Sequence, residues 1–210
     1  MPQVRWYFDF ISPFAYLQHE MLLRDQPRLR LDYRPVLFAG LLKHWGGKGP
    51  AEIPAKREVT YRHCQWLATR HRIGMKFPPA HPFNPLPALR LAVALRCAPA
   101  CVTRLFRAIY ADGADLSRAT EWQEVCRQLG VADAAERIAQ PRVKDELRAN
   151  TDAAAAAGVF GVPTLALGGQ LFWGLDMTGM ALECLENPER FNTDEYRRLT
   201  NLPVGQARKV

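Results

Sequence analysis

The stretch Gln-Val-Arg-Trp-Tyr-Phe-Asp-Phe at residues 3–10, followed directly by Ile11-Ser12-Pro13-Phe14, decides the fold. The first part is rich in aromatic and β-branched residues and predicts a strand. Ser12 is a favoured N-cap residue and Pro13 a favoured first helical residue, so a helix is predicted to begin here. Residues 29–37 alternate between apolar and polar side chains and predict a second strand. The start of the chain therefore predicts a strand–helix–strand unit with parallel strands and a right-handed crossover.

The middle of the chain has a helical pattern, from about residue 39 to residue 157. It is interrupted by a linker rich in Gly and Pro at residues 45–54 and by a Pro-rich linker at residues 77–87. The run of alanines that ends at Gly158 favours a helix that stops there. The predicted helices cover residues 55–71, 87–97, 99–111, 118–129 and 143–157.

Strand character returns near the end. Residues 163–167 and 170–173 are two short β segments joined by Gly168-Gly169, which predicts a hairpin. A last helix is expected at 176–186, followed by a surface tail. This order predicts an α/β protein with a thioredoxin-like fold, in which a large all-helical insertion separates two halves of one sheet. The expected units are a discontinuous thioredoxin-like domain (1–40 and 158–190), a helical insertion domain (41–157) and a C-terminal tail (191–210).

Composition narrows the function classes. The chain has 210 residues, of which 48% are hydrophobic and 23% charged, as in ordinary globular proteins. Its apolar runs are far shorter than the roughly 20 residues that span a bilayer, and the N-terminus does not resemble a signal peptide. We therefore expect a cytoplasmic protein that has no membrane partner. The net charge is +7, but the arginines are scattered, so we expect no nucleic-acid partner.

The five cysteines and five histidines lack metal-ligand or redox spacing. The number of cysteines is odd and no Cys-x-x-Cys pair occurs. The expected state is therefore reduced, mostly buried thiols, and no metal site is predicted.

Several segments, in order along nearly the whole chain, carry a resemblance. They are Phe8-Asp9-Phe10 with Ser12-Pro13-Phe14, residues 54–56, residues 79–86, residues 158–164 (GVFGVPT) and residues 172–176 (FWGLD). Together they resemble the 2-hydroxychromene-2-carboxylate isomerase family, which is related to kappa-class glutathione transferases and to DsbA-like thioredoxin folds. The resemblance implies glutathione as cofactor, a small aromatic carboxylate as substrate, and a possible homodimer. The implied reaction interconverts 2-hydroxychromene-2-carboxylate and trans-o-hydroxybenzylidenepyruvate by reversible addition of the glutathione thiolate.

Ser12 is the candidate catalytic residue. Free backbone N–H groups and the helix dipole favour an anion at a helix N-terminus. A hydroxyl there cannot exchange disulfides, but it can donate a hydrogen bond to a thiolate that a ligand brings. The alternative is that Ser12 only caps its helix.

Val162 and Pro163 are candidate cofactor-binding residues. A proline that opens a strand after Gly-x-Phe-Gly-x predicts a cis peptide bond facing the Ser12 helix. This bond would leave the N–H and C=O of Val162 free to pair with a peptide such as glutathione. The alternative is a trans proline at the start of a strand.

The resemblance implies four further cofactor-binding residues. Asp176 would bind the γ-glutamyl ammonium group, although a first-turn acid is an equally simple interpretation. Leu175 would offer its backbone N–H, and Lys56 would reach the glycyl carboxylate. Gly47 aligns with an asparagine of the kappa relatives. Leu175 and Met177 replace the small polar residue and the arginine that usually flank this aspartate, which puts the affinity for glutathione in question.

A substrate pocket is expected between the thioredoxin-like unit and the helical block, because ligand sites favour domain interfaces. Its candidate lining residues are Phe38, Trp45, Phe83, Asn84 and Pro85, with Asn84 as the polar contact. The alternative to a substrate-binding role is that all five residues only pack in the core or the loops.

The other candidate functions are a kappa-like glutathione transferase or peroxidase that acts on other electrophiles, and a redox-silent thioredoxin-fold binding protein.

Overall fold

The computed structural model describes residues 4–206. The chain begins with β1 (Val4–Phe8), α1 (Pro13–Asp25) and β2 (Leu31–Pro35). Ser12 is the N-cap of α1 and Pro13 is its first residue, as the sequence predicts. β1 and β2 run parallel, with Val4 opposite Leu31, so α1 is the crossover helix between them.

The described residues form one four-stranded sheet, in the order β2-β1-β3-β4. β3 (Thr164–Leu167) and β4 (Gln170–Trp173) form a hairpin, and both glycines of its Gly168-Gly169 turn have positive φ. β1 pairs antiparallel with β3, where Trp6 lies opposite Leu165. Segments from the two ends of the chain therefore make one sheet, and the predicted α/β architecture is confirmed.

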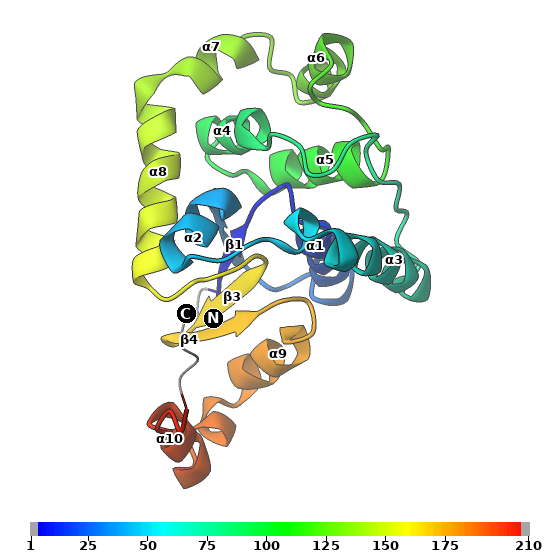
Figure 1. Cartoon of the computed structure of the whole chain (residues 1–210). Helices are drawn as coiled ribbons and strands as arrows, with labels where there is room; N and C mark the ends of the chain where they lie inside the picture. The colour runs from blue at the N-terminus through cyan, green and yellow to red at the C-terminus, as the bar shows by residue number, and fades with distance from the viewer. Residues whose placement is uncertain (1–3, 207–210) are drawn as a thin grey trace.

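Helices fill the chain between the two halves of the sheet, and the described residues 36–163 contain no strand. Figure 1 shows α4 to α7 gathered at one end of the sheet, with α8 running beside it. The structure adds α2 and α7, which the sequence pattern did not separate from their linkers. The helices are α2 (Phe38–Trp45), α3 (Pro54–His71), α4 (Leu86–Ala94), α5 (Pro99–Tyr110), α6 (Ala119–Gln128), α7 (Ala134–Ala139) and α8 (Pro141–Ala156), with a 3₁₀ turn at Pro50–Glu52.

The last part of the chain is more helical than predicted. α9 (Thr178–Glu186) is followed by a 3₁₀ turn (Pro188–Phe191) and by α10 (Asp194–Thr200), which projects away from the sheet in Figure 1. The hydroxyl oxygen of Thr193 accepts a hydrogen bond from the Tyr196 N–H and caps α10. The expected surface tail therefore includes an exposed helix, which the polar pattern concealed because it lacks a broad apolar face.

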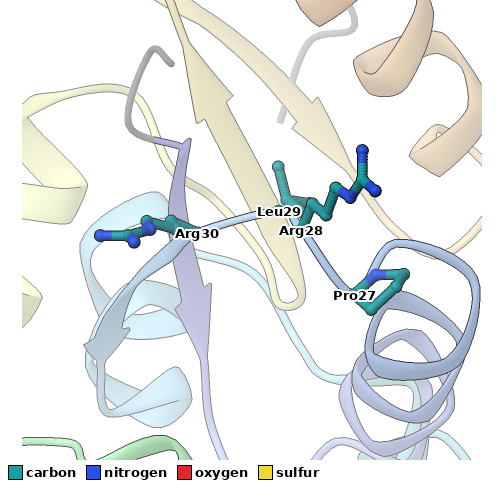
Figure 2. A pocket seen from close by; sticks show the side chains of 4 residues that line it. All are labelled: Pro27, Arg28, Leu29 and Arg30. Atoms are coloured by element: carbon teal, nitrogen blue, oxygen red, sulfur yellow. The ribbon is translucent and has the colours of Figure 1, made fainter.

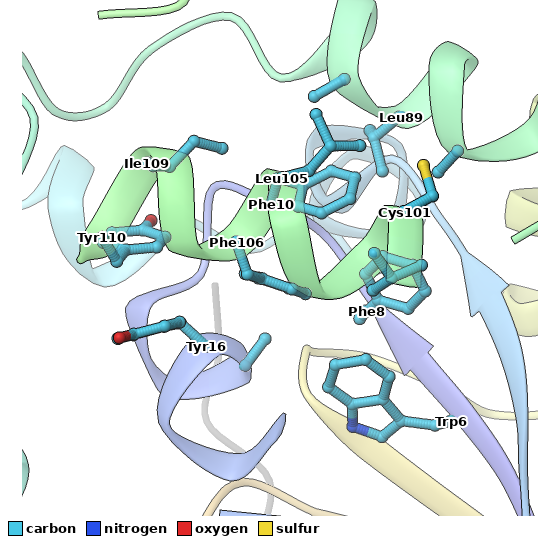
Figure 3. Packing of buried hydrophobic residues seen from close by; sticks show 14 of the residues in the cluster. Trp6, Phe8, Phe10, Tyr16, Leu89, Cys101, Leu105, Phe106, Ile109 and Tyr110 are labelled. Atoms are coloured by element: carbon cyan, nitrogen blue, oxygen red, sulfur yellow. The ribbon is translucent and has the colours of Figure 1, made fainter. Parts of the chain in front are cut away.

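The main core lies between one face of the sheet and the helices α1 and α5. Trp6 and Phe8 of β1 are fully buried and stack with ring centroids 4.7 Å apart. Phe106 of α5 lies against both rings and packs on Phe10 at 4.6 Å, as Figure 3 shows. This aromatic cluster fixes α5 across the sheet, directly above the end of β1.

The opposite face of the sheet has a smaller core. Tyr7 of β1 packs there with Val36, Leu41, Val159 and Val162. These residues come from α2 and from the segments beside β2 and β3, and α8 contributes its C-terminal alanines. β1 is therefore buried on both faces, which explains why its sequence is apolar almost throughout rather than alternating.

Replacing Phe106 with Ala should destabilise the fold by about 3–5 kcal/mol, because a fully buried ring leaves a cavity among Trp6, Phe8 and Phe10. Urea denaturation measures this change. Val59→Ala on the exposed side of α3 is the control and should change the free energy of unfolding by less than about 0.5 kcal/mol. Equal stability of the two variants would contradict the core described above.

Candidate active site

Ser12 lies in the connection between β1 and α1. It contacts both this N-terminal segment and the segment before β3. Its side chain is 7% exposed. The Oγ atom accepts a hydrogen bond from the Ala15 N–H at 3.2 Å and donates one to the Val162 carbonyl at 3.3 Å. Ser12 is therefore an N-cap that also links the start of α1 to the loop before β3.

The Val162–Pro163 peptide bond is cis, as the sequence predicts. The expectation that both backbone groups of Val162 stay free is half right. Its carbonyl accepts the Ser12 hydroxyl, because a buried hydroxyl needs an acceptor. Its N–H has no hydrogen-bond partner among the described residues, and neither has the Phe14 N–H in the first turn of α1. Two free donors therefore flank Ser12.

The turn before α9 is tied to the cis proline. The Gly174 N–H donates to the Pro163 carbonyl at 2.8 Å, and Gln18 of α1 donates to the Gly174 carbonyl at 3.0 Å. These bonds bring Leu175 and Asp176 close to Pro163. The exposed Asp176 carboxylate lies over Gly174, whose φ of +85° favours glycine. Asp176 lies in this turn, two residues before α9 begins, and not in the helix as predicted.

Two predicted cofactor-binding residues lie on exposed surface with no contact that ties them to Ser12. Lys56 is exposed in the first turn of α3, and α3 packs against α1. Gly47 is exposed just after α2, where its N–H donates to the Leu42 carbonyl at 2.9 Å. Their roles toward glutathione stay predictions.

The five predicted substrate residues form two groups, and the structure does not gather them in one cavity. Phe38 and Trp45 belong to α2; the Trp45 indole is 51% exposed and donates to the Val159 carbonyl at 3.0 Å. Phe83, Asn84 and Pro85 precede α4, and the Asn84 amide oxygen accepts the Leu86 N–H at 3.1 Å. Phe83 and Asn84 line a pocket of only about 30 Å³, which is too small for a bicyclic substrate.

A larger hollow lies elsewhere. A pocket of about 600 Å³ is lined by residues 27–30, which connect α1 to β2. This loop precedes β2, whereas Ser12 follows the parallel strand β1, so the pocket and Ser12 lie at opposite ends of the strands. Figure 2 shows the side chains of Arg28 and Arg30 pointing away from one another. The pocket therefore lacks the convergent polar groups of a ligand site.

Asp9 is a site residue that the sequence analysis did not single out. Its carboxylate is fully buried and accepts hydrogen bonds from the Ile11 N–H at 3.1 Å and the Phe38 N–H at 2.8 Å. Burial raises the pKa of Asp9 to about 7, although the backbone hydrogen bonds act in the opposite direction. The sequence signal for this site was a single acidic residue inside the aromatic run Trp-Tyr-Phe-Asp-Phe. Acidic side chains are rarely fully buried unless they are paired, so a buried one marks an unusual position.

The helical insertion holds the peptide group in front of Ser12. The Ile11 carbonyl accepts the Tyr110 hydroxyl at 2.8 Å and the His81 Nε2 at 2.7 Å. A carbonyl only accepts, so Nε2 carries the hydrogen and Nδ1 faces the Tyr61 hydroxyl at 2.7 Å. Burial lowers the pKa of His81, which favours the neutral ring. These three side chains come from α3, α5 and the Pro-rich linker, and nothing in their sequence spacing links them.

An aromatic pair borders the cis-proline loop. Phe160 and Trp173 are each 47% exposed, and their ring centroids are 5.0 Å apart. The Trp173 indole lies so close to Gly161 that a Cβ atom there would collide with it. A larger residue at position 161 would therefore require the indole to move.

The cysteines do not supply a nucleophile to this site. All five are free. Burial raises the pKa of Cys64, Cys97 and Cys101 to about 12, so these thiols stay protonated. Among residues 4–206, no three His, Cys, Asp or Glu side chains are grouped so that they could hold a metal ion. No helix in the described chain is long and apolar enough to cross a membrane.

Comparisons with known proteins show what this chain is similar to. A family model described as a DSBA-like thioredoxin domain matches residues 3–185. The 2-hydroxychromene-2-carboxylate isomerase of Sphingobium xenophagum is 29% identical over 180 residues, which cover 82% of this chain and 92% of that protein. Human glutathione S-transferase kappa 1 is 27% identical over 177 residues, which cover 76% and 78%.

A solved structure of a 2-hydroxychromene-2-carboxylate isomerase is similar in fold. It superposes with a TM-score of 0.77 at 24% identity, over 92% of this chain and 98% of that one. The complex of the cytosolic disulfide reductase DsbM from Pseudomonas aeruginosa with GSH superposes with a TM-score of 0.56 at 17% identity. Because both structures are less than 25% identical to this chain, their similarity shows a shared fold.

The raised pKa of Asp9 makes a testable contribution to stability. The carboxyl binds a proton up to about pH 7 when folded, but only up to about pH 4 when unfolded. Between these values the folded state holds the extra proton, so the Asp9 contribution to stability falls as pH rises. Asp9→Asn should remove this part of the pH dependence, measured by urea denaturation from about pH 4 to pH 8. An identical pH dependence in both proteins would contradict the raised pKa.

Proposed function

Since this chain belongs to the DSBA-like thioredoxin domain family, we propose that it is a glutathione-dependent isomerase of the 2-hydroxychromene-2-carboxylate type. Its reaction would interconvert the cyclic 2-hydroxychromene-2-carboxylate and the open trans-o-hydroxybenzylidenepyruvate. Relatives named as this isomerase align over 82–91% of the chain at 27–29% identity, which supports the proposal.

The observation that carries the proposal is Ser12 at the start of α1, flanked by the free N–H groups of Phe14 and Val162. The hydroxyl and the Phe14 N–H are suited to an anionic sulfur, and the Val162 N–H is suited to a peptide carbonyl. The exposed Asp176 carboxylate lies near the cis proline, where it could take an ammonium group. These residues fit glutathione, whereas Leu175 offers no side-chain hydrogen bond to it.

The residues of the chain would bind and orient glutathione and the substrate, and glutathione would supply the nucleophile. When bound, glutathione would supply a thiolate for reversible addition to the conjugated carbon of the substrate, which would turn a double bond into a single bond free to rotate. Ser12 would turn its hydroxyl from the Val162 carbonyl toward the sulfur, and the dipole of α1 would favour the negative charge.

The first test is the dependence of isomerisation on glutathione. Purified protein should interconvert the two isomers only when glutathione is present, and the amount of glutathione should not fall, because it is regenerated. Absorbance of the open isomer and a thiol assay measure the two quantities together. Isomerisation at the same rate in the absence of any thiol would rule the mechanism out.

Ser12→Ala should slow isomerisation near neutral pH by about 10- to 150-fold, since a hydrogen bond to a charged group contributes about 1.5–3 kcal/mol. The rate should partly recover at higher pH, where the thiolate forms without help. The pH profile of turnover is the measurement.

Thr193→Ala is the matched control for Ser12→Ala. It removes an N-cap hydroxyl from α10, remote from the site, and should cost about 1 kcal/mol in stability with an unchanged pH profile. If Ser12→Ala behaves in the same way, Ser12 is only a cap.

A kappa-like glutathione transferase is the second candidate. Kappa transferases from rat, human and Caenorhabditis elegans match this chain at 26–27% identity, close to the values of the isomerases. A transferase would consume one glutathione for each electrophile, whereas the isomerase consumes none. A redox-silent binding protein would bind glutathione or a peptide and catalyse neither reaction.

A further inference from the structure

The Asp9 carboxylate lies at the starts of two helices. Its oxygens accept the Ile11 N–H, which precedes α1, and the Phe38 N–H, which is the first of α2. The Ser12 N–H donates to the Asp9 carbonyl at 3.0 Å. The carboxylate and the candidate sulfur-binding group Ser12 therefore belong to one hydrogen-bonded loop of four residues.

No cation is paired with this carboxylate among the described residues. The titratable groups that face this loop are the Tyr110 hydroxyl from α5, His81 from the Pro-rich linker, and Tyr61 and Cys64 from α3. None of them carries a positive charge in its favoured state near neutral pH. The Asp9 charge is thus supported by neutral backbone N–H groups alone, those of Phe10, Ile11 and Phe38.

A second negative charge at Ser12 would lie in the same four-residue loop as this carboxylate, which no cation in the described part of the chain balances. Like charges that share a poorly solvated site raise one another's pKa, so the two anions do not persist together. Burial already raises the pKa of Asp9 to about 7, and repulsion from a neighbouring thiolate would raise it further.

We propose that Asp9 takes up the proton that the thiol of glutathione loses when its sulfur is held at Ser12, an inference that rests on the proposed function. The S–H bond breaks, an O–H bond forms on the Asp9 carboxyl, and the electron pair stays on sulfur. The summed charge of carboxyl and thiol is −1 before and after. The site therefore gains a thiolate without releasing a proton to solvent, and Asp9 returns the proton when the sulfur leaves.

His81 is the competing acceptor, because its Nδ1 could bind a proton while Tyr61 turns its hydroxyl to the His81 carbonyl, 2.9 Å away. Burial lowers the pKa of His81 and raises that of Asp9. Both shifts favour the carboxyl as the proton acceptor.

The experiment counts the protons released for each thiolate formed. Glutathione is titrated calorimetrically into the full-length protein at about pH 8, in two buffers with different ionisation enthalpies, and ultraviolet absorption measures the thiolate. The wild type should release close to no protons per thiolate, and Asp9→Asn about one. Asp32→Asn on β2, the same chemical change next to Arg34, is the control and should match the wild type. S-methylglutathione, which has no thiol proton, should give no difference among the three proteins.

Infrared difference spectra keep the inference testable if Asp9→Asn does not fold or forms no thiolate. Glutathione added to the wild type at about pH 8 should produce the C=O band of a protonated carboxyl group. Release of about one proton per thiolate by the wild type, or absence of this band, would overturn the inference while leaving the proposed function intact. Loss of the proton uptake in His81→Asn but not in Asp9→Asn would assign the proton to His81 instead. Absence of any glutathione binding would overturn the proposed function itself.

Discussion

The short connection from β1 to α1 is the constraint on which the site depends. Four residues, 9–12, turn a central strand into a helix, and nearly every polar group in them is used. The Asp9 side chain accepts backbone N–H groups, the Ile11 carbonyl accepts two side-chain donors, and the Ser12 hydroxyl reaches the Val162 carbonyl. Because the strand below is buried on both faces, this loop has no freedom to relax.

Local patterns were sufficient to predict the elements that make the sheet and the cis proline. Ser12-Pro13 encodes a helix start, and Gly168-Gly169 encodes a hairpin, so short-range chemistry decides both. The hydrogen bonds that hold the Ile11 carbonyl next to Ser12 were not predictable from local patterns. Tyr110 lies 99 positions from Ile11 and His81 lies 70 positions from it, and only the packing of α5 and the linker on the sheet brings them together. Asp176 was misplaced by two residues because an acid suits a turn and a helix start equally well.

The chain belongs to the DSBA-like thioredoxin domain family, yet the residue at the start of α1 is Ser12 and not a cysteine. Its buried cysteines, such as Cys64, lie in the core and have raised pKa values. The helical insertion is part of the site, since Tyr110 and His81 bind the Ile11 carbonyl in front of Ser12 and Tyr61 positions His81.

The order of the strands also determines when the sheet can be completed during synthesis of the chain. β1 is a central strand, but its partner on one side, β3, begins at Thr164, far behind β2 in the chain. At the usual 5–20 residues per second, a ribosome needs roughly ten seconds to add the intervening helices. During that time the edge of β1 that pairs with β3 is without its partner strand. The length of the helical insertion thus sets how long the backbone N–H and C=O groups of this edge stay unpaired, and unpaired strand edges favour aggregation.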